Sequence, residues 1–467
     1  MKSLSGLDGA FLSLETPATP MHVGSLHLFE PPPGYRRNFY PAVKKMMETR
    51  LHLAPVLRRH LVAMPLKFAN PVWIDAEVDF DYHVRRVVLP APGSWEQLQD
   101  CVAGLHAELL ERSRPLWMLY VIEGLASGDK GYYIKVHHAL IDGKSGVQMA
   151  GALFDLTPVP ARIKPASPAR SAEDAPGMLA LATAALRHDA AQYRKLLAHL
   201  PALADTVAGA IGAARKAGVP GSTPARRIAG ALWRNVSFGP RTSLNGAITG
   251  ERTFAALSLP MDEVKAIATA KATTVNDVVL ALCGGTLRRY LGRHGGIPAK
   301  PLIAAMPISL REAGNRESNT QATLSLVNLA TDIADPVKRL HAVQAAAGAT
   351  KSVAKRAKSV IPVDFPTIGG PWVIAALAAI YGRTGLADAI PPIANVVISN
   401  VPGPEIPLYV AGARMKGYWP LSIVEHGVGL NITLMSYAGA LGIGFTAASR
   451  AVPEPQELVV DMLAAHQ

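Results

Sequence analysis

Residues 132–143 read YYIKVHHALIDG. The aromatic and β-branched residues before the histidines predict a strand whose end delivers His137 and His138. A three-residue loop separates them from Asp142 and Gly143, and a helix is predicted over 145–154. Adjacent strand residues point to opposite faces, so only one histidine can face a given cavity. The stretch predicts an α/β fold in which one histidine faces a site and the other packs or orients.

The pattern HHxxxDG has three interpretations. The first is a pair of structural histidines at a strand end. The second is a metal site of two histidines and Asp142, although side chains on opposite strand faces converge poorly on one ion. The third is general base catalysis, because a neutral imidazole accepts a proton near pH 7. A chance match in a chain of this length is rare, on the order of one in a thousand, which favours chemistry.

Two other catalytic motifs are excluded. The sequence Gly143-Lys144-Ser145 is similar to the end of a phosphate-binding loop, but the required glycine five residues earlier is replaced by His138. A serine hydrolase is excluded because no G-x-S-x-G occurs.

The composition indicates a large protein with its own hydrophobic cores. The chain has 467 residues, of which 49% are hydrophobic. Its two cysteines, Cys101 and Cys283, lie in apolar helical patterns and are interpreted as buried free thiols, which suits a reducing compartment. Asp8 and Glu15 interrupt the first residues, so no signal peptide is expected. No apolar run of about 18 residues occurs, so any membrane contact is expected to be peripheral.

The net charge is basic, with 47 Lys and Arg against 35 Asp and Glu, or formally +12. Nucleic acid, anionic lipid or a polyanion such as coenzyme A would each suit that charge. Basic stripes and aromatic stacking motifs are absent from the sequence, so no nucleic-acid partner is expected.

The chain divides into two α/β regions and a linker. Residues 1–157 contain HHxxxDG, residues 158–240 are proline-rich and then alanine-rich and helical, and residues 241–467 form the second α/β region. The linker helix either packs on a domain or lies, as a basic amphipathic helix, on a lipid surface. Strands are predicted at 22–29, 118–122, 132–136, 254–257, 302–306, 324–329, 395–399, 430–437 and 441–447, with 78–89 extended. Further helices are predicted at 96–112, 261–270, 275–290 and 455–465.

Several short motifs accompany HHALIDG, which itself resembles the coenzyme-A-dependent acyltransferase superfamily of chloramphenicol acetyltransferase and peptide-synthetase condensation domains. They are PMHVG at 20–24, PLW at 115–117, TVNDVVLA at 274–281, MPISLR at 306–311 and SNVPGP at 399–404. In order and spacing, over nearly the whole chain, they resemble the bacterial wax ester synthase/diacylglycerol acyltransferase family.

The resemblance implies two similar chloramphenicol-acetyltransferase-like domains with a channel at their interface and HHxxxDG at its middle. It implies that long-chain acyl-CoA esterifies a fatty alcohol to a wax ester, or diacylglycerol to triacylglycerol. Acyl-CoA is then a substrate, and no cofactor or metal is needed. It also implies a cytoplasmic enzyme associated peripherally with the inner membrane and lipid droplets.

His138 is the predicted general base, and His137 is expected to support the loop. The acceptor oxygen attacks the thioester directly, so no acyl-enzyme forms. Asp142 either orients His138, as in a triad, or, as the resemblance suggests, turns away and pairs with an arginine, for which Arg311 of the second domain is our candidate. We favour the ion pair, whose loss would cost about 3–5 kcal/mol. Gly143 suits a backbone turn after the loop.

Five further positions are assigned, each with an alternative role. Asn276 is expected near the reacting carbonyl and Asp277 at a substrate, or both cap their helix. Pro115, Leu116 and Trp117 line the lipid channel or belong to the core. Alternatives for the whole protein remain open: another alcohol or amine acceptor, a non-catalytic lipid-binding or droplet protein, or a metal-dependent hydrolase.

Overall fold

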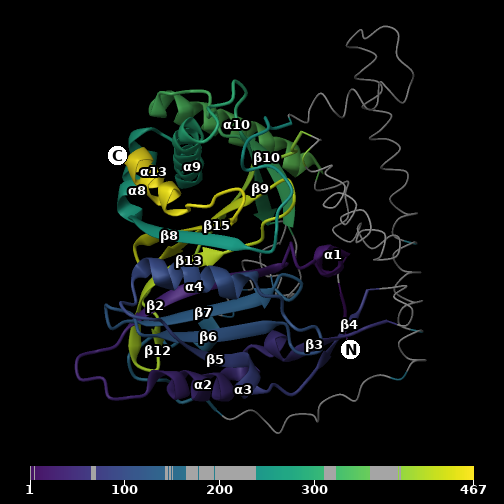
Figure 1. The fold of residues 1–467 in the computed structure, drawn as a ribbon, viewed down its shortest axis with the longest axis vertical. Helices are drawn as coiled ribbons and strands as arrows, with labels where there is room; N and C mark the ends of the chain where they lie inside the picture. Colours follow the sequence, from purple (N-terminus) through teal and green to yellow (C-terminus); the bar gives the residue numbers. More distant parts are fainter. Residues whose placement is uncertain are drawn as a thin grey trace.

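The computed structural model describes residues 2–4, 6–64, 70–141, 151–164, 238–309, 322–357 and 391–467, with Gly146, Met149, Gly177, Thr183, Arg194 and Asp388. Within these ranges the chain forms two six-stranded sheets that lie one above the other (Figure 1). Most of the linker predicted at 158–240 lies outside the described residues.

The first sheet has the strand order β12-β13-β2-β7-β6-β5. Its strands are β2 (His22–Glu30), β5 (Val84–Val88), β6 (Trp117–Glu123), β7 (Lys130–His137), β12 (Tyr409–Val410) and β13 (Ala413–Leu421). The central strands β2 and β7 are antiparallel, with His22 opposite His137 and His27 opposite Tyr132. This register places the PMHVG motif directly beside the two histidines.

The second sheet has the order β10-β9-β11-β14-β15-β8. Its strands are β8 (Arg252–Pro260), β9 (Ile303–Ser309), β10 (Ala322–Asn328), β11 (Val396–Val401), β14 (Leu430–Tyr437) and β15 (Ala440–Ala448). The hairpin between β14 and β15 turns at Ala438 and Gly439, whose φ angles are 44° and 86°. Two successive positive φ angles define the tight turn that matches the twist of a hairpin, and glycine takes such an angle at little cost.

Two strands from the C-terminal part of the chain belong to the first sheet. Strands β12 and β13 follow the second region's β11 in sequence, yet β13 pairs with β2 of the first sheet, from Leu421 opposite Gly24 to Arg414 opposite Glu30. The sequence boundary at residue 241 therefore does not separate the two sheets. The predicted division into 1–157 and 241–467 missed this exchange, because a strand pattern does not reveal which sheet the strand joins.

Helices cover the sheets and lie between them (Figure 1). The helix α4 (Trp95–Ala107) packs against β8 and also contacts β2 and β7, so it joins the two halves. The other helices are α1 (Gly6–Leu14), α2 (Phe39–Arg50), α3 (Phe80–His83), α8 (Met261–Ala270), α9 (Val275–Arg293), α10 (Pro336–Ala357) and α13 (Gln456–His466). A small sheet of β1 (Lys2–Ser3), β4 (Val72–Asp75) and β3 (Arg59–Val62) lies near the N-terminus.

The predicted strands and long helices lie within a few residues of the observed ones, except at 78–89. There, the Asp79 side chain accepts hydrogen bonds from the backbone N–H groups of Asp81 and Tyr82 and starts the short helix α3, so β5 begins only at Val84. The helix predicted over 145–154 lies partly outside the described residues and stays a prediction. Among the described residues, no single helix is long and apolar enough to cross a bilayer; α8 and α9 reach that composition only together, with a bend of 102° between them.

Candidate active site

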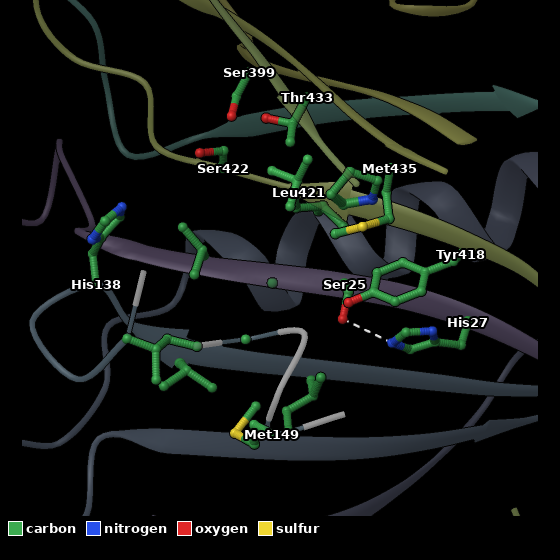
Figure 2. A pocket seen from close by; sticks show the side chains of 18 of the residues that line it. Ser25, His27, His138, Met149, Ser399, Tyr418, Leu421, Ser422, Thr433 and Met435 are labelled. Carbon is green, nitrogen blue, oxygen red and sulfur yellow. Dashed lines mark hydrogen bonds between the residues drawn. The ribbon is translucent and has the colours of Figure 1, made fainter. Parts of the chain in front are cut away.

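A cavity of about 210 Å³ lies between the two sheets. The first sheet contributes residues of β2 and β7, and the second contributes residues of β11 and β14, with β13 closing the side. Most of the wall is apolar, including Val23, Ile134, Val136, Leu153 and Met435. Figure 2 shows His138 at one end and a polar group of side chains, Ser25, His27 and Tyr418, at the other.

His138 follows the last residue of β7 and lines this cavity. Its backbone N–H donates to the carbonyl of Met21 at 2.9 Å, which extends the β2–β7 pairing by one residue. Its ring stacks on Phe11 of α1, with 4.2 Å between ring centroids and 22° between planes. The side chain is half-buried, so the imidazole is packed on one face yet reachable from the cavity.

His137 points to the other side of the strand and is fully buried. Its Nδ1 accepts a hydrogen bond from the backbone N–H of Ala139 at 3.1 Å, so the neutral ring carries its proton on Nε2. Nε2 lies 3.3 Å from Oε1 of Glu15. His137 therefore holds the loop after the strand and is itself held by the Glu15 carboxylate. It faces away from His138, as alternation along a strand predicts.

Glu15 follows α1 and connects three segments of the first half. One carboxylate oxygen faces His137 and accepts the backbone N–H of Met21 at 3.3 Å; the other accepts Arg112 at 3.0 Å. Burial raises the pKa of Glu15, but His137 and Arg112 outweigh it and hold that pKa below its ordinary value. An ionised carboxylate is therefore fixed behind the histidine pair.

The far end of the cavity is polar. Ser25 and His27 lie two residues apart on β2, so both face the cavity, and Ser25 Oγ is 2.8 Å from His27 Nε2. Burial lowers the pKa of His27 to about 3, so its ring is neutral near pH 7. Burial also raises the pKa of Tyr418, partly offset by the Ser25 hydroxyl.

A second buried polar network lies behind β2. His106, in the last turn of α4, is bonded through Nδ1 to the Tyr133 hydroxyl at 2.7 Å and through Nε2 to the Ser422 carbonyl at 3.1 Å. Burial lowers the pKa of His106 to about 3. His22 donates to the carbonyl of His106, and burial, then the charge of His106, lowers its pKa well below the ordinary value. These neutral histidines connect α4 to the end of β13.

Asn276 and Asp277 open α9, and they have different surroundings. Asp277 is buried and completes a capping box: Thr274 N–H donates to its carboxylate at 3.0 Å, and its own N–H donates to Thr274 Oγ1 at 3.2 Å. These contacts favour the capping role over the predicted substrate contact. The Asn276 amide lies 3.9 Å from Met306 Sδ, next to Pro307 of the cavity wall.

Pro115, Leu116 and Trp117 do not belong to the cavity wall among the residues that the structure describes. All three are buried in the first half, where the Trp117 indole N–H donates to the Leu57 carbonyl at 2.8 Å. The Leu116 carbonyl accepts the backbone N–H of His137 at 2.9 Å. The structure thus favours the core interpretation, with the motif supporting the histidine strand rather than lining the channel.

Asp142, Gly143 and Arg311 lie outside the described residues, so the ion pair and the turn stay predictions. In the described part of the chain, no three His, Cys, Asp or Glu side chains gather as they would around a metal ion. Cys101 and Cys283 do not line the cavity, and burial raises the pKa of both thiols, that of Cys283 to about 12. Neither has the surroundings of a nucleophile.

The sequence-based prediction missed Phe11, Glu15 and the polar end of the cavity. Strand alternation carries a signal for Ser25 and His27, since they share a face with Val23. For Phe11 and Glu15 the only signal is proximity to the PMHVG motif, because their contact with the histidines arises from the tertiary fold.

Two sequence models of one protein family match most of this chain. A sequence model of the wax ester synthase/diacylglycerol acyltransferase catalytic domain matches residues 4–279, and one of the C-terminal domain matches residues 319–466. A Mycobacterium tuberculosis protein named for diacylglycerol O-acyltransferase activity is 37% identical over 98% of this chain and 96% of its own length. A Mycobacterium bovis protein of the same designation is 34% identical over 97% of this chain and 96% of its own.

Solved structures agree with these matches. The wax ester synthase/diacylglycerol acyltransferase from Marinobacter aquaeolei has a TM-score of 0.68 and 29% identity, covering 100% of this chain and 98% of that chain. The first condensation domain of the calcium-dependent antibiotic synthetase has a TM-score of 0.56 and 16% identity, covering 100% and 94%, and shows the shared fold alone. The expected chloramphenicol-acetyltransferase-like fold is confirmed, and this chain belongs to the wax ester synthase/diacylglycerol acyltransferase family.

Proposed function

We propose that this protein moves a long acyl chain from acyl-CoA to the hydroxyl of a fatty alcohol, giving a wax ester, or of diacylglycerol, giving triacylglycerol, with His138 as general base. Family membership makes it an acyl-CoA-dependent O-acyltransferase. The observation that carries the residue assignment is His138 at one end of an apolar cavity between the sheets. Such a cavity suits hydrocarbon chains, and an imidazole at its end suits proton transfer from a hydroxyl.

In the proposed reaction, His138 accepts the proton of the acceptor hydroxyl as its oxygen attacks the thioester carbonyl. The tetrahedral oxyanion collapses, the carbon–sulfur bond breaks, and the coenzyme A thiolate takes the proton back from the imidazolium. General base assistance of this kind contributes roughly 10²–10⁴-fold. The stack on Phe11 supports this role, because a fixed ring needs less reorganisation before it accepts a proton.

The oxyanion needs hydrogen-bond donors, and the wall contributed by the second half of the chain offers hydroxyls. Ser399 of β11 and Ser422 after β13 line the cavity on that wall (Figure 2). Thr433 also lines it, but its hydroxyl donates to Asn431 at 2.7 Å. We propose Ser399 and Ser422 as the donors among the described residues, a role that hydroxyls fill in other acyl transfers.

We also propose that the enzyme works in the cytoplasm at the surface of the inner membrane and of lipid droplets. Fatty alcohols and diacylglycerols partition into lipid, so the acceptor has to be taken from such a surface. The net charge of +12 supports attraction to anionic lipid.

Coenzyme A release, read with a thiol reagent, tests the proposal. Wild type, His138→Ala and the control His341→Ala, an exposed histidine of α10, each receive palmitoyl-CoA with hexadecanol and then with dipalmitoylglycerol. Release is expected to need an acceptor and to fall roughly 10²–10⁴-fold in His138→Ala only.

Each other outcome has a meaning. Residual transfer above about a tenth in a folded His138→Ala would overturn the base assignment. Release without acceptor would indicate a thioesterase. No release from folded wild type would point to an untested alcohol or amine acceptor, or to a lipid-binding role.

A further inference from the structure

The polar end of the cavity serves no step of the proposed reaction. Ser25, His27 and Tyr418 all line the cavity, yet they lie at the end opposite His138 (Figure 2). His27 is 1% exposed. Its ring lies among four aromatic rings, those of Phe29, Tyr132, Phe154 and Tyr418, the last with a centroid distance of 4.3 Å.

Three polar side chains are an unusual lining for a cavity that holds only a hydrocarbon chain. His27 Nε2 is bonded to Ser25, but Nδ1 is buried and has no hydrogen-bond partner among the described residues. Buried polar atoms in folded proteins nearly always have a partner, because an unpaired one loses its contacts with water. An apolar residue at position 27 would suit a hydrocarbon chain better.

The distance from the reaction centre limits what can reach this end. His27 pairs with Tyr132, and His137 lies five residues further along β7, a rise of about 17 Å. The ester groups of a diacylglycerol lie only a few bonds from its reacting hydroxyl, so they do not extend that far. A group that meets Ser25, His27 and Tyr418 has to be carried well along an acyl or alkyl chain.

We propose that Ser25, His27 and Tyr418 form a specificity site for a substrate chain that carries a distal oxygen, as a hydroxyl or a carbonyl. The inference rests on the proposed acyl transfer and adds the substrate class to it. The Ser25 hydroxyl contacts both His27 and Tyr418. Lone pairs on the Ser25 and Tyr418 oxygens can accept from a substrate hydroxyl, and, when His27 Nε2–H donates to Ser25, one of the two hydroxyl protons is left to donate to a substrate carbonyl. The site gives an oxygenated chain a higher kcat/KM than a plain chain of equal length.

Paired substrates test the site. With hexadecanol as acceptor, 12-hydroxystearoyl-CoA is compared with stearoyl-CoA; with stearoyl-CoA as donor, 1,12-octadecanediol is compared with octadecanol. In one of the two pairs, wild type is expected to favour the oxygenated chain in kcat/KM by about 3- to 10-fold, the range of one net hydrogen bond. The pair that responds identifies whether the donor or the acceptor occupies the cavity.

Variants assign the preference to the site. Ser25→Ala and Tyr418→Phe, which keeps the ring, are expected to bring the ratio close to one, mainly by slowing the oxygenated substrate. The control Met435→Leu changes an apolar residue of the same cavity and is expected to leave the ratio unchanged. Melting temperatures confirm that each variant is folded.

The contrary results are distinct. Equal or weaker turnover of both oxygenated chains by wild type would overturn the site, as would Ser25→Ala and Tyr418→Phe variants that keep the wild-type ratio. A wild type that releases no coenzyme A with any of the four combinations would instead overturn the proposed acyl transfer.

Discussion

Two histidines line the same cavity and differ in almost every respect other than residue type. His138 follows the end of β7, is half-buried and stacks on Phe11, with a carboxylate fixed behind its neighbour. His27 lies in the middle of β2, is bonded to Ser25, and has a pKa lowered by burial to about 3. A base has to be reachable and able to hold a proton near neutral pH, whereas a buried ring with so low a pKa acts as a neutral partner. Surroundings therefore decide the role.

The largest effect within this comparison is expected from Glu15, which holds the His138 end. Glu15→Ala should lower kcat by about 10- to 100-fold with little change in KM, because His137 loses the carboxylate that lies 3.3 Å from its Nε2 and the loop loses its support. Glu15→Gln should recover part of the rate, since its amide oxygen can still accept from Nε2. Steady-state kinetics measure both.

Arg112→Gln is the matched control, because it removes the other partner of Glu15 but leaves the contact with His137. It should have a smaller effect on kcat than Glu15→Ala. A folded Glu15→Ala variant with the wild-type kcat would show that the His138 end needs no such support.

The next largest effect is expected from the buried histidines, which should make the protein less stable as the pH falls. The pKa of His27 and of His106 is lowered to about 3, so the folded state takes up their protons only in strong acid. Their stabilising contribution is complete above the unfolded value near 6.5 and is lost as pH falls toward 3. At pH 5.5 the free energy of unfolding should be lower by about 1.4 kcal/mol for each.

Urea unfolding at pH 7.5 and 5.5 measures this loss, in a range where carboxylates of ordinary pKa stay ionised. His27→Leu should reduce the difference between the two pH values by one histidine's share. If the unfolding free energy changes equally between the two pH values in wild type and in His27→Leu, His27 has an ordinary pKa and its surroundings are hydrated.

A smaller effect is expected from the ring under His138. Phe11→Leu should lower kcat by about 2- to 10-fold, because it removes the stack but keeps an apolar contact. Phe11→Tyr keeps the ring and should stay near wild type. If both variants behave alike, the stack does not position the base.

The smallest effect is expected from the thiols. Replacing Cys101 and Cys283 by alanine should leave kcat near the wild-type value, because neither lines the cavity and burial raises the pKa of both. Rapid-quench kinetics should show no burst of coenzyme A without an acceptor. A burst that disappears in Cys101→Ala would reveal an acyl-enzyme.

The sequence was sufficient for features that depend on neighbouring residues. Alternation predicted β2 and β7, and the step of one residue between His137 and His138 predicted that they face opposite sides. The alternative that Asp277 caps its helix followed from helix-start chemistry, and the structure places Asp277 in a capping box with Thr274.

The sequence did not predict features that depend on contacts between residues far apart in the chain. Glu15 and Arg112 meet only because the end of α1 lies beside the segment that follows α4, and Tyr418 reaches Ser25 only because β13 joins the first sheet. Asp79 shows a local failure: an aspartate that caps a short helix looks like any other polar residue in an extended stretch. The role of Pro115, Leu116 and Trp117 could not be decided from the sequence for another reason: an apolar triplet suits a core and a channel equally.

The exchange of β13 also sets an order of events during synthesis. Strands β2 and β7 leave the ribosome early, but the free edge of β2 has no partner until residues 413–421 follow. At roughly 5–20 residues per second, the delay between residues 137 and 413 lasts about 15 s to a minute. During that time an unpaired sheet edge is exposed to other nascent chains. The first half of the enzyme is therefore expected to depend on chaperones until residues 413–421 are made.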